Sequence, residues 1–165
     1  MWERKEVPLL TRAINIAVAA HGGTLDRGGA LYILHPLRVM LSGENEDEMI
    51  VGVLHDTVED TYVTLETLRF AGFSKEIVAA VDAVSRRKTE TYRQYIQRIV
   101  DAGTLAIKVK LFDIADNCDP KRMSGLPPDE ATGMMKRYSD ATWTLGMALS
   151  KARGLEERGT DTAVS

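Results

Sequence analysis

The sequence predicts an all-α protein, a compact bundle of about seven or eight helices. Apolar residues recur at three- and four-residue spacing through most of the chain, which is the spacing of one helix face. Glycine and proline residues separate these segments at short intervals. Residues 105–111 come close to the alternation of a strand, but no nearby segment offers a partner strand, so we expect a buried helix there too.

Four helices are expected in the first half of the chain. The first covers residues 3–20 and ends at a glycine pair, ahead of a loop with four glycines in eleven residues. Pro36 opens the second helix, because its missing N–H costs little in a first turn. The third begins near Asn45 and runs to about Asp60. Thr64 is a good N-cap for a short fourth helix that a glycine ends.

Four more helices are expected in the second half. Ser74 begins one of them, and its valines share one face. The next covers residues 89–100, and the most apolar stretch of the chain, residues 105–114, follows it. Three prolines then mark a loop before a long helix over residues 129–153.

Composition favours one soluble domain. The chain has 165 residues, and we expect the domain to span residues 1–153 and residues 154–165 to form a disordered tail. The 21 basic and 24 acidic residues give a net charge of −3, without the basic excess typical of nucleic-acid binding. A single cysteine, Cys118, and the lack of a leader-like or membrane-length apolar run favour a cytoplasmic protein with no membrane partner. The oligomeric state is left open.

The segment VLHDTVEDT, residues 53–61, places one histidine and three carboxylates within six positions. His55, Asp56, Glu59 and Asp60 form either a solvated helix face or a metal site with acid–base partners. The apolar MIVGVL that precedes them leads the chain from the core directly into this charged group. Acids at the end of a helix also oppose its dipole. We therefore favour a metal or catalytic site, and imidazole with carboxylate suits Mn, Fe, Co or Zn.

A second acidic cluster occurs in FDIADNCDP, again after a mostly apolar segment. It contains Asp113, Asp116 and Asp119, with Asn117 among them. Two buried segments thus each deliver acids at their C-terminal ends, which indicates convergence on one cavity. The alternative is a simple turn, because Asn, Asp and Pro are turn-forming residues.

Four ordered motifs extend this interpretation: AHGG, LYILHPLRVM, VGVLHDTVEDT and VKLFDIADN. Together they resemble the metal-dependent HD hydrolase domain of the RelA/SpoT family, and more narrowly its small stand-alone alarmone hydrolases. The resemblance runs from Ile14 to Asp119, with a weaker echo in KRY at residues 136–138. It implies removal of the 3′-pyrophosphate from ppGpp or pppGpp, with GDP or GTP and pyrophosphate as products.

The resemblance also implies a metal site. One divalent cation, Mn²⁺ in this family, would be held by His35, His55, Asp56 and Asp113. Such a site leaves positions open for water and for a substrate oxygen, and the cation lowers the pKa of the bound water towards about 7.

Further residues are implied around the metal. Glu59 and Asp60 would orient and deprotonate the attacking water, and Asn117 and Tyr138 would contact the nucleotide. From the residues themselves, we expect phosphates to meet a cation. The candidates are Arg27, the one basic residue of the glycine-rich loop, and the cluster Arg86, Arg87 and Lys88, for which an ordinary basic helix end is the alternative.

Three departures from the family affect the expected substrate. Thr24, Asp26 and Leu31 stand where relatives carry glutamine, arginine and proline. ppApp, the 2′-phosphate of NADPH or another nucleotide phosphate are therefore alternative substrates, and a non-catalytic nucleotide-binding module is a third possibility. Since 46 residues follow Asp119, too few for a synthetase domain, we expect the chain to degrade an alarmone.

Overall fold

The regular structure of this chain is helical, apart from one isolated bridge between Leu25 and Leu31. The structure, a computed structural model, describes residues 6–161, with side chains up to Leu155. Eight of the helices in this range have six residues or more, so the predicted all-α class is confirmed. The helices are α1 (Leu9–Ala20), α2 (Leu34–Leu41), α3 (Glu46–Leu54), α4 (Thr57–Asp60), α5 (Leu65–Phe70), α6 (Lys75–Val84), α7 (Tyr92–Ala102), α8 (Thr104–Asn117), α9 (Pro120–Met123) and α10 (Pro128–Asp161).

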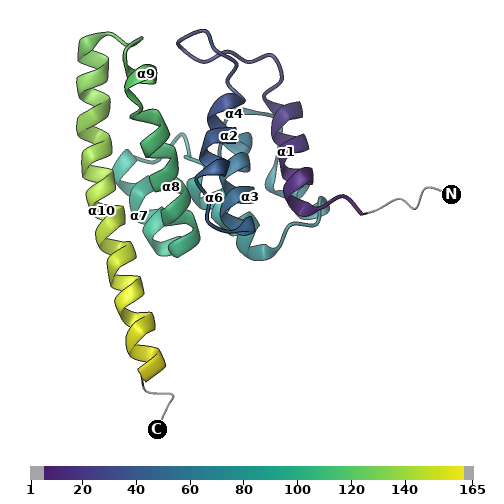
Figure 1. Ribbon diagram of the computed structural model, residues 1–165, viewed down its shortest axis with the longest axis vertical. Coiled ribbons are helices and arrows are strands. Elements are labelled where there is room, and N and C mark those ends of the chain that lie inside the picture. Colours follow the sequence, from purple (N-terminus) through teal and green to yellow (C-terminus); the bar gives the residue numbers. More distant parts are fainter. Residues whose placement is uncertain (1–5, 162–165) are drawn as a thin grey trace, which may run out of the picture.

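Helix α3 lies at the centre of the bundle, between α1, α2, α6 and α8. Figure 1 shows α7 and α8 between α3 and α10, and α10 forms the flank opposite α1. The close packing of α2 on α3 depends on Gly52, since a Cβ there would lie 3.1 Å from the backbone nitrogen of Met40. This contact joins the last turn of α2 to α3, and at the start of α2 the ring of His35 lies 5.1 Å from that of His55.

Helix α8 confirms the choice made for the apolar stretch at residues 105–111. Ala106, Ile107 and Val109 are buried in the core that α8 shares with α3, α6 and α7. The short α9 occupies part of the loop predicted from prolines, and Asp119 caps it.

Helix starts and ends differ from the predictions at two places. Helix α1 begins at Leu9 and not at residue 3, because Pro8 disfavours helical backbone in the residue before it; residues 1–5 lie outside the described range. Helix α7 begins at Tyr92 and not at residue 89. Thr91 and Gln94 form a capping box there, a signal that the sequence carries as T-x-x-Q.

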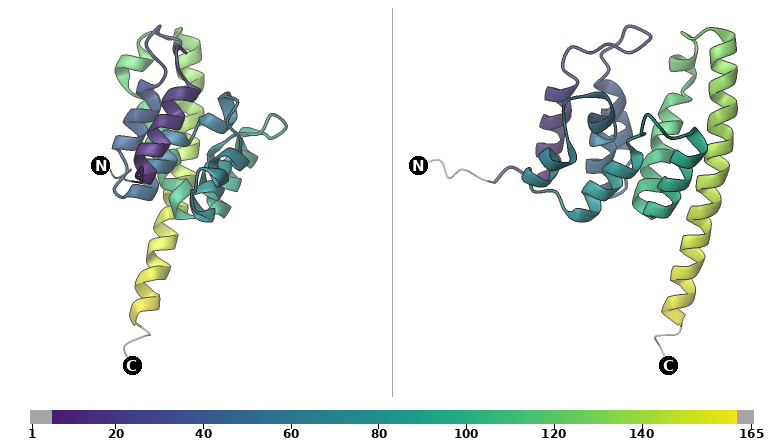
Figure 2. Two further views of the ribbon diagram at one scale, coloured as in Figure 1. Left: turned by 90° about the vertical axis from the view of Figure 1, so that its right-hand side faces the viewer. Right: turned by 180° about the vertical axis from the view of Figure 1, so that it is seen from behind.

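Helix α10 is longer than expected. Its end was placed at residue 153, but the helix continues through Asp161. The segment LEER that follows Gly154 consists of good helix formers, and a helix that has formed extends at little cost. Figure 2 shows the C-terminal part of α10 projecting beyond the other helices. Within residues 6–161, no helix has the length and apolar character needed to cross a membrane.

Candidate metal centre

The four side chains predicted as metal ligands meet where the start of α2, the end of α3 and the second half of α8 come together. Nε2 of His35 lies 3.1 Å from Oδ1 of Asp113 and 3.6 Å from Oδ2 of Asp56. Nε2 of His55 lies 2.9 Å from Oδ2 of Asp56 and 3.5 Å from Oδ1 of Asp113. Both histidines and Asp113 are buried. Ligand atoms of His35, His55 and Asp56 all lie within 4.8 Å of one another, and Oδ1 of Asp113 lies beside both histidine nitrogens.

A break in the helix allows the adjacent His55 and Asp56 to reach the other predicted ligands together. On a continuous helix the two side chains would point about 100° apart. The structure ends α3 at Leu54, although we expected one helix through to Asp60. Nδ1 of His55 donates to the carbonyl of Gly52 over 2.7 Å, and Oγ1 of Thr57 donates to the carbonyl of Leu54, also over 2.7 Å. These side chains hold the turn between α3 and α4.

The donor set fits a divalent cation. Because the Gly52 carbonyl can only accept, Nδ1 of His55 carries the proton, and Nε2 presents its lone pair. This Nε2 is buried and makes no hydrogen bond of normal geometry within the described residues. Burial lowers the pKa of His55, but the charges of Asp56 and Asp113 outweigh it and raise that pKa well above its usual value. A cation would take the place that an imidazole proton otherwise fills.

Asp116 orients the His35 ring so that its Nε2 faces the other predicted ligands. Its Oδ2 lies 2.6 Å from Nδ1 of His35, on the ring side away from the other ligands. Arg38 donates to both carboxylate oxygens, over 2.5 and 3.1 Å, and Arg122 donates to Oδ2 as well. Burial opposes ionisation of Asp116, yet His35 and Arg38 keep its pKa well below the usual range. Asp116 therefore remains an acceptor that directs Nε2 of His35 to the centre.

The second acidic cluster thus divides, although we expected its members to converge. Asp113 enters the centre, and Asp116 lies behind one ligand. Asp119 instead accepts a hydrogen bond from the backbone N–H of Lys121 over 2.8 Å, which caps α9. Only the first of the three acids faces the histidine Nε2 atoms.

Three further side chains bond the ligand carboxylates. Nζ of the largely buried Lys110 lies 2.6 Å from Oδ2 of Asp113, and Nδ2 of Asn117 donates to Oδ1 of Asp113 over 2.6 Å. The Tyr32 hydroxyl donates to Oδ2 of Asp56. Sequence reasoning did not single out Lys110 or Tyr32. For Lys110 the signal was its position three residues before Asp113, which on a helix is the adjacent turn. Tyr32 precedes α2 and reaches Asp56, 24 positions away, so local spacing carries no signal for it.

Glu59 and Asp60, the predicted acid–base pair, lie in α4 directly after the ligand pair. Oε2 of Glu59 accepts a hydrogen bond from the backbone N–H of Arg86 over 2.6 Å, which ties α4 to the loop between α6 and α7. Both side chains reach solvent, and partial burial still raises the pKa of each. The charge of Asp56 raises both values further. Such carboxylates are stronger bases than free ones.

The other two predicted substrate-binding residues, Tyr138 and Arg27, lie in different surroundings. Tyr138 on α10 is partly buried, burial raises its pKa, and the charge of Asp113 adds to this effect. Tyr138 stacks on Arg137 and packs against the core. Arg27 is 81% exposed and pairs with Glu130 in the first turn of α10 over 3.1 Å. None of its described hydrogen bonds or ion pairs joins it to the ligands.

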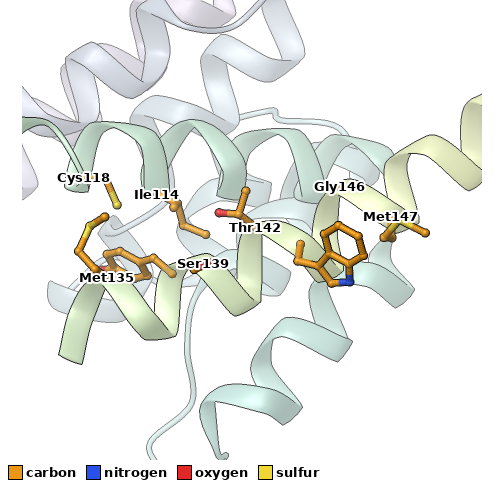
Figure 3. A pocket seen from close by; sticks show the side chains of 9 residues that line it. Ile114, Cys118, Met135, Ser139, Thr142, Gly146 and Met147 are labelled. Atoms are coloured by element: carbon orange, nitrogen blue, oxygen red, sulfur yellow. The ribbon is translucent and has the colours of Figure 1, made fainter. Parts of the chain in front are cut away.

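An open groove runs between the second half of α8 and α10 (Figure 3). Its volume is about 550 Å³, and its walls are mainly apolar. One of its lining residues, Ile114, follows the predicted ligand Asp113 on α8. Its lining residues are Ile114, Cys118, Met135, Tyr138, Ser139, Thr142, Trp143, Gly146 and Met147.

Sequence comparison finds relatives among long enzymes, whereas no protein-family model matches the chain. A probable GTP pyrophosphokinase of Mycobacterium leprae is 30% identical over 164 residues, which cover 91% of this chain and 21% of the relative. The bifunctional (p)ppGpp synthase/hydrolase SpoT of Escherichia coli is 29% identical over 170 residues, covering 93% of this chain and 24% of the relative. A guanosine-3′,5′-bis(diphosphate) 3′-pyrophosphohydrolase of Aquifex aeolicus is 31% identical over 120 residues, covering 66% and 17%. This chain spans about a fifth of the length of these curated relatives.

Structural comparison finds a neighbour of nearly the same extent. It is described as a metazoan ortholog of SpoT that hydrolyzes ppGpp and plays a role in starvation responses. The TM-score is 0.72 at 18% identity, over 95% of this chain and 99% of that chain. The two chains therefore share a fold. The sequence similarity to the curated relatives and the shared fold with this neighbour confirm the resemblance of the chain to RelA/SpoT-type proteins.

Proposed function

We propose that this protein is a metal-dependent phosphohydrolase that removes the 3′-pyrophosphate from ppGpp or pppGpp and releases GDP or GTP. One observation carries the proposal: ligand atoms of His35, His55 and Asp56 lie within 4.8 Å of one another, and Oδ1 of Asp113 lies 3.1 and 3.5 Å from the two histidine nitrogens. Relatives by sequence and the neighbour by fold are named for ppGpp hydrolysis, which supports the substrate. Mn²⁺ as the cation and the cytoplasm as the location belong to the same proposal.

Each group has a defined task in this proposal. A bound cation supplies an acidified water and a polarised phosphoryl oxygen. Glu59 and Asp60 hold that water and take its proton, which suits their raised pKa values. Asn117 donates to Asp113, and we place the nucleoside on this side of the centre, towards the groove that Tyr138 lines.

Turnover assays test the proposal. Pure protein with Mn²⁺ and ppGpp is expected to release pyrophosphate and GDP, and a chelator is expected to stop the reaction. Replacing Asp56 with Ala should abolish both Mn²⁺ binding and turnover, while Asp140→Ala, an exposed acid on α10, should change neither. The helical circular dichroism of both variants should match the wild type.

Two results would contradict the proposal at different points. Full activity of Asp56→Ala would refute the site. Inertness towards both ppGpp and pppGpp with every divalent cation tried would refute the activity. ppApp and NADPH serve as comparison substrates, and faster turnover of either would change the substrate assigned to the site.

A further inference from the structure

Two arginines from distant parts of the chain lie against one aromatic ring. Arg86, in the loop between α6 and α7, has its guanidinium carbon 5.7 Å from the ring centre of Tyr92. Arg137, on α10, lies 5.5 Å from the same centre and 5.5 Å from the ring centre of Tyr138. Both arginines are exposed. Among the described residues no carboxylate forms a salt bridge with either, although six other arginines have such partners.

The Tyr92 hydroxyl is a third donor at this place. It is buried and has no hydrogen-bond partner within the described residues, which is uncommon for a buried polar atom. Burial raises the pKa of Tyr92, so the hydroxyl keeps its proton. The charges of Lys110, Asp113 and Arg137 act on it. The Tyr92 ring lies 5.9 Å from the ring of Tyr95, and Nζ of Lys110, the partner of Asp113, lies 5.1 Å from the Tyr95 ring centre.

The same loop also contacts the proposed base. The backbone N–H of Arg86 donates to Oε2 of Glu59 over 2.6 Å, so one residue touches the base and also presents a guanidinium to solvent. Arg137 reaches the same neighbourhood through Tyr92, which packs on Tyr95 beside Lys110. These contacts place the arginine pair next to the residues that surround the proposed centre.

A purely structural explanation accounts for only part of this arrangement. An arginine stacked on an exposed ring makes a weak contact that can fasten a loop to a helix. Fastening requires one cation, however, and two guanidinium groups on the same ring repel each other. An anion between them would relieve that repulsion and would also give the Tyr92 hydroxyl an acceptor.

We propose that Arg86, Arg137 and the Tyr92 hydroxyl form an arginine clamp. The clamp binds the leaving pyrophosphate group of the substrate, with its two linked phosphoryl groups. The planar fork of a guanidinium matches two phosphate oxygens, and two forks match a group with several negative charges. The clamp rests on the proposed function, since it deepens the same site. It assigns to this chain a specificity for leaving groups that carry at least two phosphoryl groups.

Binding of inorganic pyrophosphate tests the clamp directly. The full chain is titrated calorimetrically with pyrophosphate, once with Mn²⁺ and once with a chelator. Arg137→Gln and Arg86→Gln should each weaken binding by about tenfold or more under both conditions. Lys136→Gln and Arg93→Gln, exposed neighbours of Arg137 and Tyr92, lose the same charge and should leave the affinity near the wild-type value.

Two further measurements distinguish a role in anion binding from a role in attaching the loop to α10. Tyr92→Phe removes only the unpartnered hydroxyl, so it should weaken pyrophosphate binding without lowering the melting temperature. Orthophosphate should bind more weakly than pyrophosphate to the wild type, and the arginine variants should remove this preference. Circular dichroism confirms that each variant is folded. Equal pyrophosphate affinity in the wild type and both arginine variants would overturn the clamp.

The clamp and the proposed function can fail separately. Turnover of ppGpp by the wild type, with unchanged pyrophosphate affinity and KM in both arginine variants, would overturn the clamp and leave the function standing. Arginine-dependent binding of pyrophosphate by a protein that hydrolyses no alarmone would support the clamp and contradict the function.

Discussion

At the scale of single residues, the orientation of the predicted ligands depends on groups that lie behind them. Nε2 of His35 points at the other ligands because Nδ1 bonds Asp116, which Arg38 and Arg122 hold from two sides. A carboxylate behind a histidine ligand fixes both the tautomer and the ring orientation. Asp116 is therefore a positioning residue, and its effect should appear in metal affinity before it appears in catalysis.

Replacing Asp116 with Ala should weaken Mn²⁺ binding about 10- to 100-fold. The variant loses the acceptor for Nδ1 of His35 and leaves two arginines without their carboxylate. Calorimetric titration with Mn²⁺ measures the dissociation constant. Asp119→Ala is the control, because that acid caps α9 and touches none of the ligands, so its affinity should equal the wild-type value. Equal affinities for all three proteins would contradict the role given to Asp116.

Sequence motifs single out the four residues that we predict as ligands, but not the contacts of their neighbours. The HP and HD pairs and the LFD motif mark His35, His55, Asp56 and Asp113, and geometry brings these four side chains together. Asp116 looked like a member of the same cluster. Its contact with His35 joins residues 81 positions apart, and helical spacing within one segment carries no information about such a distance.

At the scale of elements, sequence predicted which segments are helical better than where they begin and end. The break between α3 and α4 arises from side chains that bond nearby carbonyls, as Thr57 does with Leu54, and hydrophobic spacing does not register such bonds. The start of α7 could have been found from the capping box of Thr91 and Gln94. The first of these errors matters most for function, because the break is what lets two adjacent ligands converge.

The loop between α6 and α7 is held by one arginine. The guanidinium of Arg98 donates to the carbonyls of Asp82, Ala83 and Ser85 over 2.8, 3.0 and 2.9 Å. It also donates to the Glu90 carboxylate over 2.6 and 3.1 Å. Arg98 thereby satisfies the end of α6 and fixes the loop that carries two of the proposed functional contacts.

Arg98→Ala should lower the free energy of unfolding by about 2–3 kcal/mol at neutral pH, because it leaves partly buried carbonyls without a donor. Arg98 keeps the pKa of Glu90 below its usual value, against a smaller effect of burial. A carboxylate with a lowered pKa stabilises the fold above its unfolded pKa, and this contribution is lost as the pH falls through the folded pKa. The difference between wild type and variant should therefore shrink below about pH 4.

Urea unfolding at pH 7 and at pH 3 measures both effects. Arg93→Ala, an exposed position on the same helix, is the control and should change stability little at either pH. A variant as stable as the wild type at pH 7 would show that the loop does not depend on Arg98. A difference that stays constant down to pH 3 would show that Glu90 takes no part.

At the scale of the whole molecule, α3 and α8 are joined near both ends. Lys108 on α8 bonds the buried Glu48 at the start of α3 over 2.8 Å. Asp113 lies five residues further along α8 and meets His55 just beyond the end of α3. The first junction is an ion pair between Lys108 and Glu48. At the second junction, the carboxylates of Asp56 and Asp113 lie close enough to repel each other. A dication at the second junction would join the two halves of the bundle.

Saturating Mn²⁺ should therefore stabilise the entire fold and not only the site. At a free concentration of about 100 times the dissociation constant, binding adds about 2.7 kcal/mol to the free energy of unfolding. For a chain of this size, that corresponds to a rise of about 5–10 °C in melting temperature. Scanning calorimetry with and without Mn²⁺ measures the shift. Asp140→Ala should keep it and Asp56→Ala should lose it, because only the second removes a ligand that lies between α3 and α8. A wild-type melting temperature that is unaffected by Mn²⁺ would contradict a cation bridge between these helices, whatever the activity of the protein.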